Sequence, residues 1–519
     1  MHIKLMGAIV FCALLLFALN SNLTAETPIV WGDLSPGQYA VGFKTFEKFD
    51  HSRTFQPKTD YFGEKIEGIR ARPVQACLWY PAAAQDDEMS MNYGEYMFAY
   101  PEDDRLFNIL SAIQNREIQM LFSRVRDQNI MLTISNTLFA AVRDAQPAEG
   151  KFPLVIYHPD IGGIYCNNAV LCEFLASHGY AVLSASPLGM KSVNVDEDHA
   201  SLEFQARDKE FAWTLVKDQE FIDFDRLALV GANSGGLMAL EMQMRNTDVD
   251  AMVSIEGWLT QADKAEFCKN SPFLDPIRMH KPFLHISIGP QEELDYSLFE
   301  SLKYSDRTLI HWADLPGDGF VHYPMFTLLM SDEIKTMTAS VREAHEDICE
   351  LVLAFLNENI KDESSAQDTF AQLASNVPSA EIKSFTAQEL PPTPNQFIRI
   401  VESKGVDKAL EIFQKFHELE PERVFFQERR LNLLGYQALN RGQVEDAIKL
   451  FKMNTAAYPS SCNTWDSLSD GYMAANDTEN AIKCMKKVLE TIPIDTVNDD
   501  QLKAQLKEKC ERMLNELQG

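Results

Sequence analysis

The stretch 230–236, Val-Gly-Ala-Asn-Ser-Gly-Gly, has the residue types of a sharp turn that joins a strand to a helix. In a G-x-S-x-G turn the glycines let two backbones approach closely, and the serine between them is held where a histidine can activate it for attack on an ester. Aligned without a gap, Gly231 and Gly235 are those glycines and Asn233 stands at the serine position. A histidine cannot deprotonate a carboxamide for such an attack. This alignment therefore predicts the frame of a nucleophile turn without the nucleophile.

A second alignment makes Ser234 the nucleophile, in an A-x-S-x-G variant of the same turn. The shift by one residue moves one glycine out of its turn position and puts Leu237 where Gly236 otherwise stands. The uninterrupted match from Asp225 to Gly236 favours the first alignment, in which Ser234 supplies at most a backbone N–H group.

The surrounding sequence has the pattern of elements that would position this turn. Apolar runs typical of buried strands alternate with amphipathic stretches typical of helices. We expect strands at 152–157, 180–185, 227–230, 251–255, 283–288 and 309–312, and helices at 169–178, 202–217, 237–245 and 348–360. This alternation predicts an α/β fold with a doubly wound, mostly parallel sheet.

Two segments depart from that alternation. Residues 70–81 alternate apolar and polar residues and end in proline, as expected of an antiparallel strand at the edge of a sheet. Residues 97–145 predict a helical insertion ahead of the central sheet, with helices around 105–115 and 129–145.

Segment 70–361 resembles the platelet-activating-factor acetylhydrolase and dienelactone-hydrolase branch of the α/β-hydrolases. The resembling stretches keep their order and spacing: Leu-Trp-Tyr-Pro at 78–81, Gly-Lys-Phe-Pro-Leu-Val-Ile-Tyr at 150–157, Leu-Ala-Ser-His-Gly-Tyr-Ala-Val at 175–182, the block 225–236 and Phe-Leu-Asn at 355–357. The resemblance implies an α/β-hydrolase fold and hydrolysis of carboxylic esters through an acyl-enzyme, with no metal or organic cofactor.

The same resemblance implies a catalytic triad in the chain order nucleophile, acid, histidine. Ser234 would then be the nucleophile and His322, in a glycine-rich loop after the last predicted strand, the general base. Glu256 would orient the histidine, and Glu292 or Glu293 after the next strand is the alternative acid.

The loop that would bind the oxyanion also departs from the family pattern. Relatives read His-Gly-x-Gly-Gly after the first core strand, where backbone N–H groups face the developing charge. Here the stretch 158–163 reads His-Pro-Asp-Ile-Gly-Gly, so Pro159 removes one donor and Asp160 brings a negative charge to the site. The donors that remain would come from Ile161 and Ser234.

The net charge argues against polyanionic partners, and the N-terminal segment predicts export. A formal net charge of −29 over 519 residues repels nucleic acid. Residues 1–25 read as a secretory signal peptide, so we expect an exported protein, periplasmic or secreted, that is soluble after cleavage. The eight cysteines beyond that segment lack zinc spacing, and most are expected to be buried free thiols.

The C-terminal region has a different, helix-forming composition with an internal repeat. After a polar linker predicted at 363–394, Ala447 and Pro459 recur 34 positions later as Ala481 and Pro493. This period, with alanine at the close helix contact and proline at the turn, is typical of tetratricopeptide repeats, which we therefore predict for 395–519. Such repeats bind peptides or partner proteins on their concave face.

The sequence thus predicts a signal peptide at 1–25, an α/β-hydrolase domain at 26–362 and a tetratricopeptide-repeat domain at 395–519. The altered turn and oxyanion loop favour a weak or inactive carboxylic-ester hydrolase that acts as a binding module for an ester or lipid-like small molecule, with the repeats holding a protein partner. The alternative is an active serine carboxylesterase that uses Ser234, His322 and Glu256.

Overall fold

A computed structural model describes residues 27–518 of the chain, except for 56–63, 66–67, 69, 85–88, 98, 100–106, 108, 110, 114, 116–117, 120–126, 314–320, 362–365, 378–379 and 422. The predicted signal peptide lies outside the described residues. The chain divides into two compact units, Met1–Gln388 and Glu389–Gly519. In the part that is described, no helix is long and apolar enough to cross a membrane.

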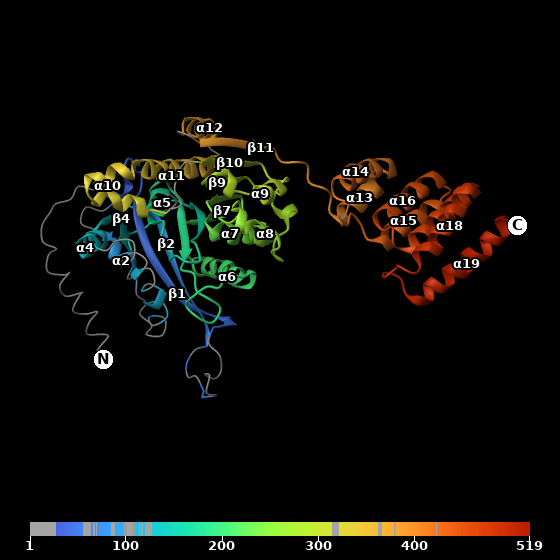
Figure 1. Cartoon of the computed structure of the whole chain (residues 1–519), viewed down its shortest axis with the longest axis horizontal. Helices are drawn as coiled ribbons and strands as arrows, with labels where there is room; N and C mark the ends of the chain where they lie inside the picture. Colours follow the sequence, from blue (N-terminus) through green and yellow to red (C-terminus); the bar gives the residue numbers. More distant parts are fainter. Residues whose placement is uncertain are drawn as a thin grey trace. The chain divides into compact units, whose positions relative to one another are not determined.

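The first unit is built on one large mixed sheet (Figure 1). The order of its described strands is β11-β10-β9-β8-β7-β5-β6-β2-β1-β4-β3. Their bounds are β1 Ala40–Thr54, β2 Ala71–Ala82, β3 Ser90–Asn92, β4 Leu138–Arg143, β5 Phe152–His158, β6 Ala181–Ala185, β7 Ile222–Ala232, β8 Ala251–Ile255, β9 Phe283–Ile288, β10 Arg307–Trp312 and β11 Ala380–Phe385.

The central strands β6, β5, β7, β8, β9 and β10 are parallel, whereas β2 pairs antiparallel with β6. Strands β3 and β4 lie beyond β1; without them, the chain from β1 to β10 visits the remaining sheet positions in the order 1-2-4-3-5-6-7-8, with the second strand antiparallel. This topology is that of the α/β-hydrolase fold, so the predicted fold class is confirmed.

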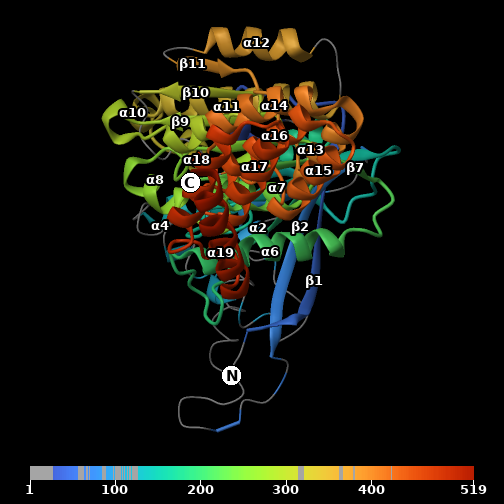
Figure 2. The same ribbon diagram turned by 90° about the vertical axis from the view of Figure 1, so that its right-hand side faces the viewer.

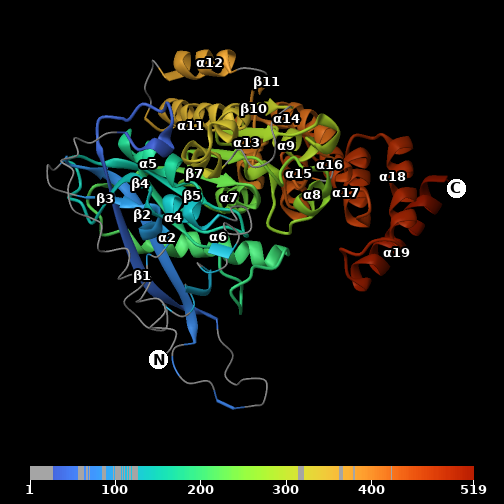
Figure 3. The ribbon, with the colours of Figure 1, turned by 60° about the vertical axis from the view of Figure 1, so that its left-hand side comes forward.

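Helices cover both faces of this sheet (Figures 1 and 3). Helices α5 (Ala169–Ser177) and α11 (Ala339–Ile360) lie on one face, and α6 (His199–Leu215) and α7 (Ser234–Arg245) lie on the other. Because both faces are covered, all seven residues of β5 are buried, as expected of a central parallel strand. The remaining short elements are η1 Ile29–Trp31, α2 Tyr93–Met97, α4 Gln128–Asn136, α8 Ala262–Lys269, η2 Pro276–Arg278, η3 Gln291–Glu293, α9 Ser297–Ser301, η4 Tyr323–Leu329, α10 Asp332–Met337 and α12 Ala366–Asn376.

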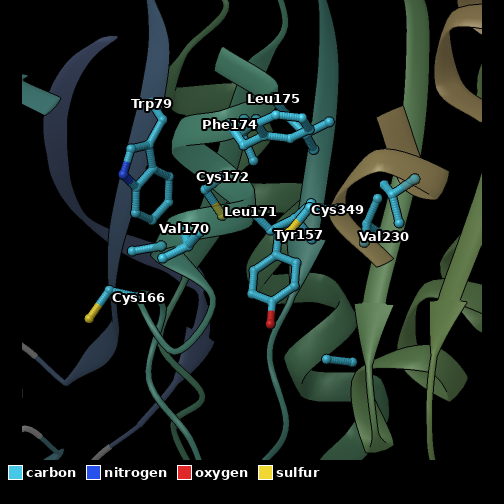
Figure 4. Close-up of a cluster of buried hydrophobic side chains, with 14 of the residues drawn as sticks. Trp79, Tyr157, Cys166, Val170, Leu171, Cys172, Phe174, Leu175, Val230 and Cys349 are labelled. Carbon is cyan, nitrogen blue, oxygen red and sulfur yellow. The ribbon is translucent and has the colours of Figure 1, made fainter. Parts of the chain in front are cut away.

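Part of the core between the sheet and α5 is shown in Figure 4. Tyr157 of β5 and Val230 of β7 lie near Cys172 of α5 and Cys349 of α11. All eight cysteines from Cys77 onward are buried and carry free thiols, the state expected for most of them.

The antiparallel side of the sheet extends further than the sequence indicates. Strand β1 pairs along the outer side of β2, and both strands extend beyond the rest of the sheet (Figure 2). Residues 70–81 therefore do not form an edge strand, contrary to the prediction. The prolines Pro73 and Pro81 are tolerated because β6 pairs only with residues 76–79 of β2, so neither proline has to donate a hydrogen bond to β6.

The predicted helical insertion is helical only in part. Helix α4 begins at Gln128 and ends at Asn136, and β4 follows, where a continuous helix to residue 145 was predicted. Strand β4 pairs with β1 and β3, so tertiary pairing overrides the local helical pattern. Of the other predicted helix, around 105–115, the described residues 107, 109, 111–113 and 115 are helical, and the rest lie outside the described residues.

The predicted linker is also partly structured. Strand β11 pairs antiparallel with β10 over six residue pairs, from Arg307–Phe385 to Trp312–Ala380, and α12 precedes it (Figure 2). The α/β unit therefore continues to Gln388 and does not end at residue 362.

The regular elements described in the second unit are all helices, which confirms the all-α class predicted for it. Its helices are α13 Pro394–Lys404, α14 Val406–Leu419, α15 Glu428–Asn440, α16 Val444–Ala457, α17 Cys462–Ala474, α18 Thr478–Thr491 and α19 Asp500–Gln518. The recurring alanines Ala409, Ala447 and Ala481 are fully buried in α14, α16 and α18. A Cβ added to Gly435 of α15 would lie 2.3 Å from the ring of Phe451, so glycine allows this close helix contact.

Candidate functional site

The turn between β7 and α7 has the sharp backbone geometry that the motif predicts. Asn233 stands at its tip with φ 53° and ψ −119°, a conformation that a non-glycine residue rarely adopts. The flanking glycines permit it, because a Cβ on Gly231 would lie 2.2 Å from the Gly235 carbonyl oxygen and a Cβ on Gly235 would lie 2.0 Å from the His158 carbonyl oxygen. The turn is therefore built as in a nucleophile elbow, and it presents a carboxamide.

The loop after β8 packs directly against this tip. Asn233 N–H donates to the Ile255 carbonyl at 2.9 Å. A Cβ on Gly257, which has φ 93°, would lie 2.4 Å from Asn233 Oδ1. Glu256, with φ 61°, is partly exposed in the same loop, so the structure brings the backbone of the predicted acid beside the elbow. Asn233 Oδ1 itself is buried and has no hydrogen-bond partner among the described residues.

Ser234 is the first residue of α7 and is fully buried. Its Oγ donates to Asp160 Oδ1 at 2.6 Å and accepts from the Ile161 N–H at 2.9 Å. The other carboxylate oxygen of Asp160 accepts from Gly162 N–H at 3.2 Å. The three residues predicted for the oxyanion region thus come together, but the Ile161 N–H is engaged by the serine hydroxyl. No histidine of the described residues hydrogen-bonds to Ser234 Oγ.

His322 is fully buried in a box of aromatic rings from η4, α2 and β4. The ring centroids of Tyr93, Phe139, Tyr323 and Phe326 lie 5.1–5.7 Å from that of the imidazole. His322 Nδ1 accepts a hydrogen bond from Ala169 N–H, in the first turn of α5, at 3.1 Å. His322 Nε2 is buried and has no hydrogen-bond partner in the part of the chain that the structure describes.

This arrangement places the proton of the neutral His322 ring on Nε2, because Nδ1 is the acceptor. A triad histidine needs the opposite tautomer: Nδ1–H donates to the acid, and Nε2 takes the proton of the nucleophile. Among the described residues, neither ring nitrogen of His322 is hydrogen-bonded to a carboxylate, whether from Glu256 or from Glu292 and Glu293, which lie in η3 after β9. As placed, His322 caps α5 and has no free lone pair for a serine.

Burial lowers the pKa of His322 well below the usual histidine value of 6.5, and the nearby His345 lowers it further. Protonation would also remove the acceptor of Ala169 N–H and put a positive charge at the positive end of the α5 dipole.

The pH dependence of stability tests this placement of His322. The folded chain keeps the ring neutral, whereas the unfolded chain binds a proton below about pH 6.5, so the free energy of unfolding falls by about 1.4 kcal/mol per pH unit below that value for this group. We expect His322→Gln, which keeps an acceptor for Ala169 N–H and cannot be protonated, to lose less stability than wild type between about pH 8 and about pH 5. Urea unfolding at both pH values measures the difference. Parallel losses in the two proteins would show that His322 titrates normally in the folded state.

Several residues of the site region carried no signal in the sequence. Tyr93 and Phe139 fall in segments that read as loop and helix, and no motif links them to His322. Glu173 of α5, which supports β4, looks like one more helix residue. Among the described residues, no three histidine, cysteine, aspartate or glutamate side chains lie close enough together to hold a metal ion.

The geometry defines an α/β-hydrolase fold with an elbow that carries asparagine. No protein-family model matches the chain, and no curated protein matches it. Among solved structures the chain is similar to a ferulic acid esterase from Streptomyces cinnamoneus, with 19% sequence identity and a TM-score of 0.45; the match covers 67% of this chain and 98% of the esterase. At this level of similarity the match says nothing about activity.

Proposed function

We propose that this chain is a non-hydrolytic α/β-hydrolase-fold protein whose first unit serves as a binding module for an ester or lipid-like small molecule. The observation that carries the proposal is Asn233 at the tip of an otherwise intact elbow. The conformation costs of the order of 1–3 kcal/mol, and such strain is retained chiefly at functional positions. Asn233 is partly exposed as a residue, and its amide is a group that can hydrogen-bond to a ligand but does not attack an ester.

The neighbouring groups support loss of the esterase reaction. For Ser234 to act as nucleophile, its Oγ must leave both Asp160 and Ile161 N–H and reach a histidine lone pair. The Asp160 carboxylate contacts the same Ser234 hydroxyl as the Ile161 N–H, the predicted oxyanion donor, so it opposes a second negative charge beside that donor. These two conditions weigh against the alternative of an active carboxylesterase built on Ser234, His322 and Glu256.

For the second unit we propose a tetratricopeptide array that holds a peptide or partner protein. The support is the period of the sequence together with the burial of Ala409, Ala447 and Ala481 at matching places in successive helix pairs. Export through a cleaved signal at 1–25 is part of the same proposal, as is the absence of nucleic acid among the partners.

Hydrolysis of p-nitrophenyl acetate tests the proposal for the first unit. We expect wild type, Ser234→Ala and His322→Ala to show the same rate as buffer with denatured protein, and a fluorophosphonate probe to leave wild type unlabelled. Asn233→Ser is also expected to stay inactive, because His322 Nε2 carries a proton and cannot accept one from the new hydroxyl.

Measured turnover of the ester would contradict the proposal. Turnover by wild type that disappears in both Ser234→Ala and His322→Ala would establish the carboxylesterase and contradict the binding-module proposal. Turnover gained by Asn233→Ser would show that His322 can change its tautomer and partner, and that only the nucleophile has been lost.

A further inference from the structure

The strained turn at Asn233 has a chemical consequence for its own side chain. Viewed along the Cα–C bond, the three substituents of Cα other than the carbonyl carbon are separated by about 120° in torsion. With ψ at −119°, the Asn233 Cα–Cβ bond is therefore nearly eclipsed with the C–N bond to Ser234. Closure of a five-membered ring through Ser234 N and Asn233 Cγ requires this eclipsed arrangement. Extended and helical backbones do not supply it, because their ψ values lie elsewhere.

The nitrogen that would attack in this ring closure is Ser234 N. Ser234 N–H belongs to the first turn of α7, where amides have no intrahelical acceptor, and no partner for it occurs among the described residues. The positive end of the α7 dipole stabilises negative charge on this nitrogen and so favours its deprotonation. The residue that follows Asn233 is a serine, whose small side chain leaves the nitrogen accessible.

The carboxamide carbon that would be attacked is Asn233 Cγ. Asn233 Oδ1 has no hydrogen-bond partner among the described residues, so pyramidalisation at Cγ breaks no hydrogen bond to that oxygen. The residue is partly exposed, which gives solvent water access to the product ring.

We propose that Asn233 is a site of spontaneous deamidation, promoted by the folded elbow. Ser234 N bonds to Asn233 Cγ, the Cγ–N bond of the side chain breaks, and the proton lost from Ser234 N leaves with the amide nitrogen as ammonia. The resulting succinimide adds one water molecule. Opening at Cγ gives an aspartate at position 233, and opening at the main-chain carbonyl gives an isoaspartate. No oxidant or cofactor takes part.

The modification goes beyond the binding role proposed above and changes the chemistry of the elbow. It replaces a neutral amide by a carboxylate at the tip of the turn, next to the loop of Asp160. The chain would then exist as two chemical forms that differ by one negative charge at the candidate site. The isoaspartate form also inserts a methylene into the main chain of the turn.

Peptide mass spectrometry of the full-length protein tests the proposal independently of any activity. The folded protein is incubated at mildly alkaline pH and sampled over time, and a parallel sample is kept in concentrated urea. We expect the peptide that contains Asn233 to gain the mass of an amide-to-acid conversion at least several-fold faster in the folded protein than in urea.

Two controls accompany the measurement. Asn246, which precedes Thr247 and has ψ 109°, lacks the eclipsed geometry and is expected to remain intact in the folded protein. Asn233→Gln lengthens the side chain by one methylene, so the five-membered ring cannot form and the mass gain should disappear. A rate at Asn233 that is equal in the folded protein and in urea, or slower in the folded protein, overturns the proposal. So does equal conversion of Asn246.

Discussion

Replacing Glu173 by leucine is expected to lower the free energy of unfolding of the α/β unit by about 3–5 kcal/mol. The Glu173 carboxylate is fully buried on α5 and accepts four hydrogen bonds: from Trp31 Nε1 at 3.1 Å, Tyr96 Oη at 2.7 Å, Ala140 N at 2.9 Å and Ala141 N at 2.8 Å. Leucine fills a similar volume but leaves all four donors buried without an acceptor. Burial raises the pKa of Glu173, and the four donors act in the opposite direction.

The loss should be concentrated in the elements that Glu173 joins. Hydrogen exchange of the β4 amides is expected to accelerate in Glu173→Leu, because Ala140 and Ala141 lose their acceptor. Tyr96→Phe, which removes a single donor and leaves the carboxylate in place, is the matched control and should cost clearly less. Equal exchange rates in β4 for wild type and Glu173→Leu would show that the strand pairing alone holds β4. Phe139 of the same strand packs on His322, so this carboxylate also supports the aromatic box.

The second large effect is expected at Asp208 of α6. Its carboxylate accepts from Arg72 Nε at 2.6 Å and Nη2 at 2.5 Å, and Arg53 Nη2 lies 2.8 Å from Oδ1. The Arg72 side chain is fully buried and that of Asp208 is 3% exposed. Asp208→Asn should lower the free energy of unfolding by about 3–5 kcal/mol, because it leaves buried guanidinium charge without a counterion. Guanidinium chloride unfolding of the α/β unit measures the change.

The neighbouring Lys209 provides the control for that prediction. Its Nζ is buried without a partner among the described residues, and burial lowers its pKa to about 8. Lys209→Met removes a buried charge that makes no hydrogen bond, so we expect unchanged or increased stability. The double variant Arg72→Met with Asp208→Leu should also be more stable than Asp208→Asn, since it removes both charges together. A Lys209→Met loss as large as that of Asp208→Asn would contradict the assigned counterion role.

The parts of the fold that follow from local periodicity were accessible from the sequence. The strands β5, β6, β8 and β9 and the helices α5 and α6 were predicted to within a few residues, because continuous burial and amphipathic spacing are written into their own residues. Strands β1 and β11 were missed. Much of β1 is partly exposed and β11 has no fully buried residue, so their strand state depends on pairing with β2 and β10. Such long-range pairing leaves little trace in local composition.

For the candidate site too, one part could be predicted from the sequence and the other could not. The sequence by itself determined where the elbow lies and that Asn233 stands at its tip, because glycine spacing dictates where two backbones can approach. Only the tertiary structure decided what the neighbouring groups do. Asp160 and Ile161 reach Ser234 from the end of another strand, and His322 meets the α5 amide of a residue 153 positions away in the chain. A hydrogen-bonded tautomer depends on which groups meet in space, and local sequence patterns do not specify that.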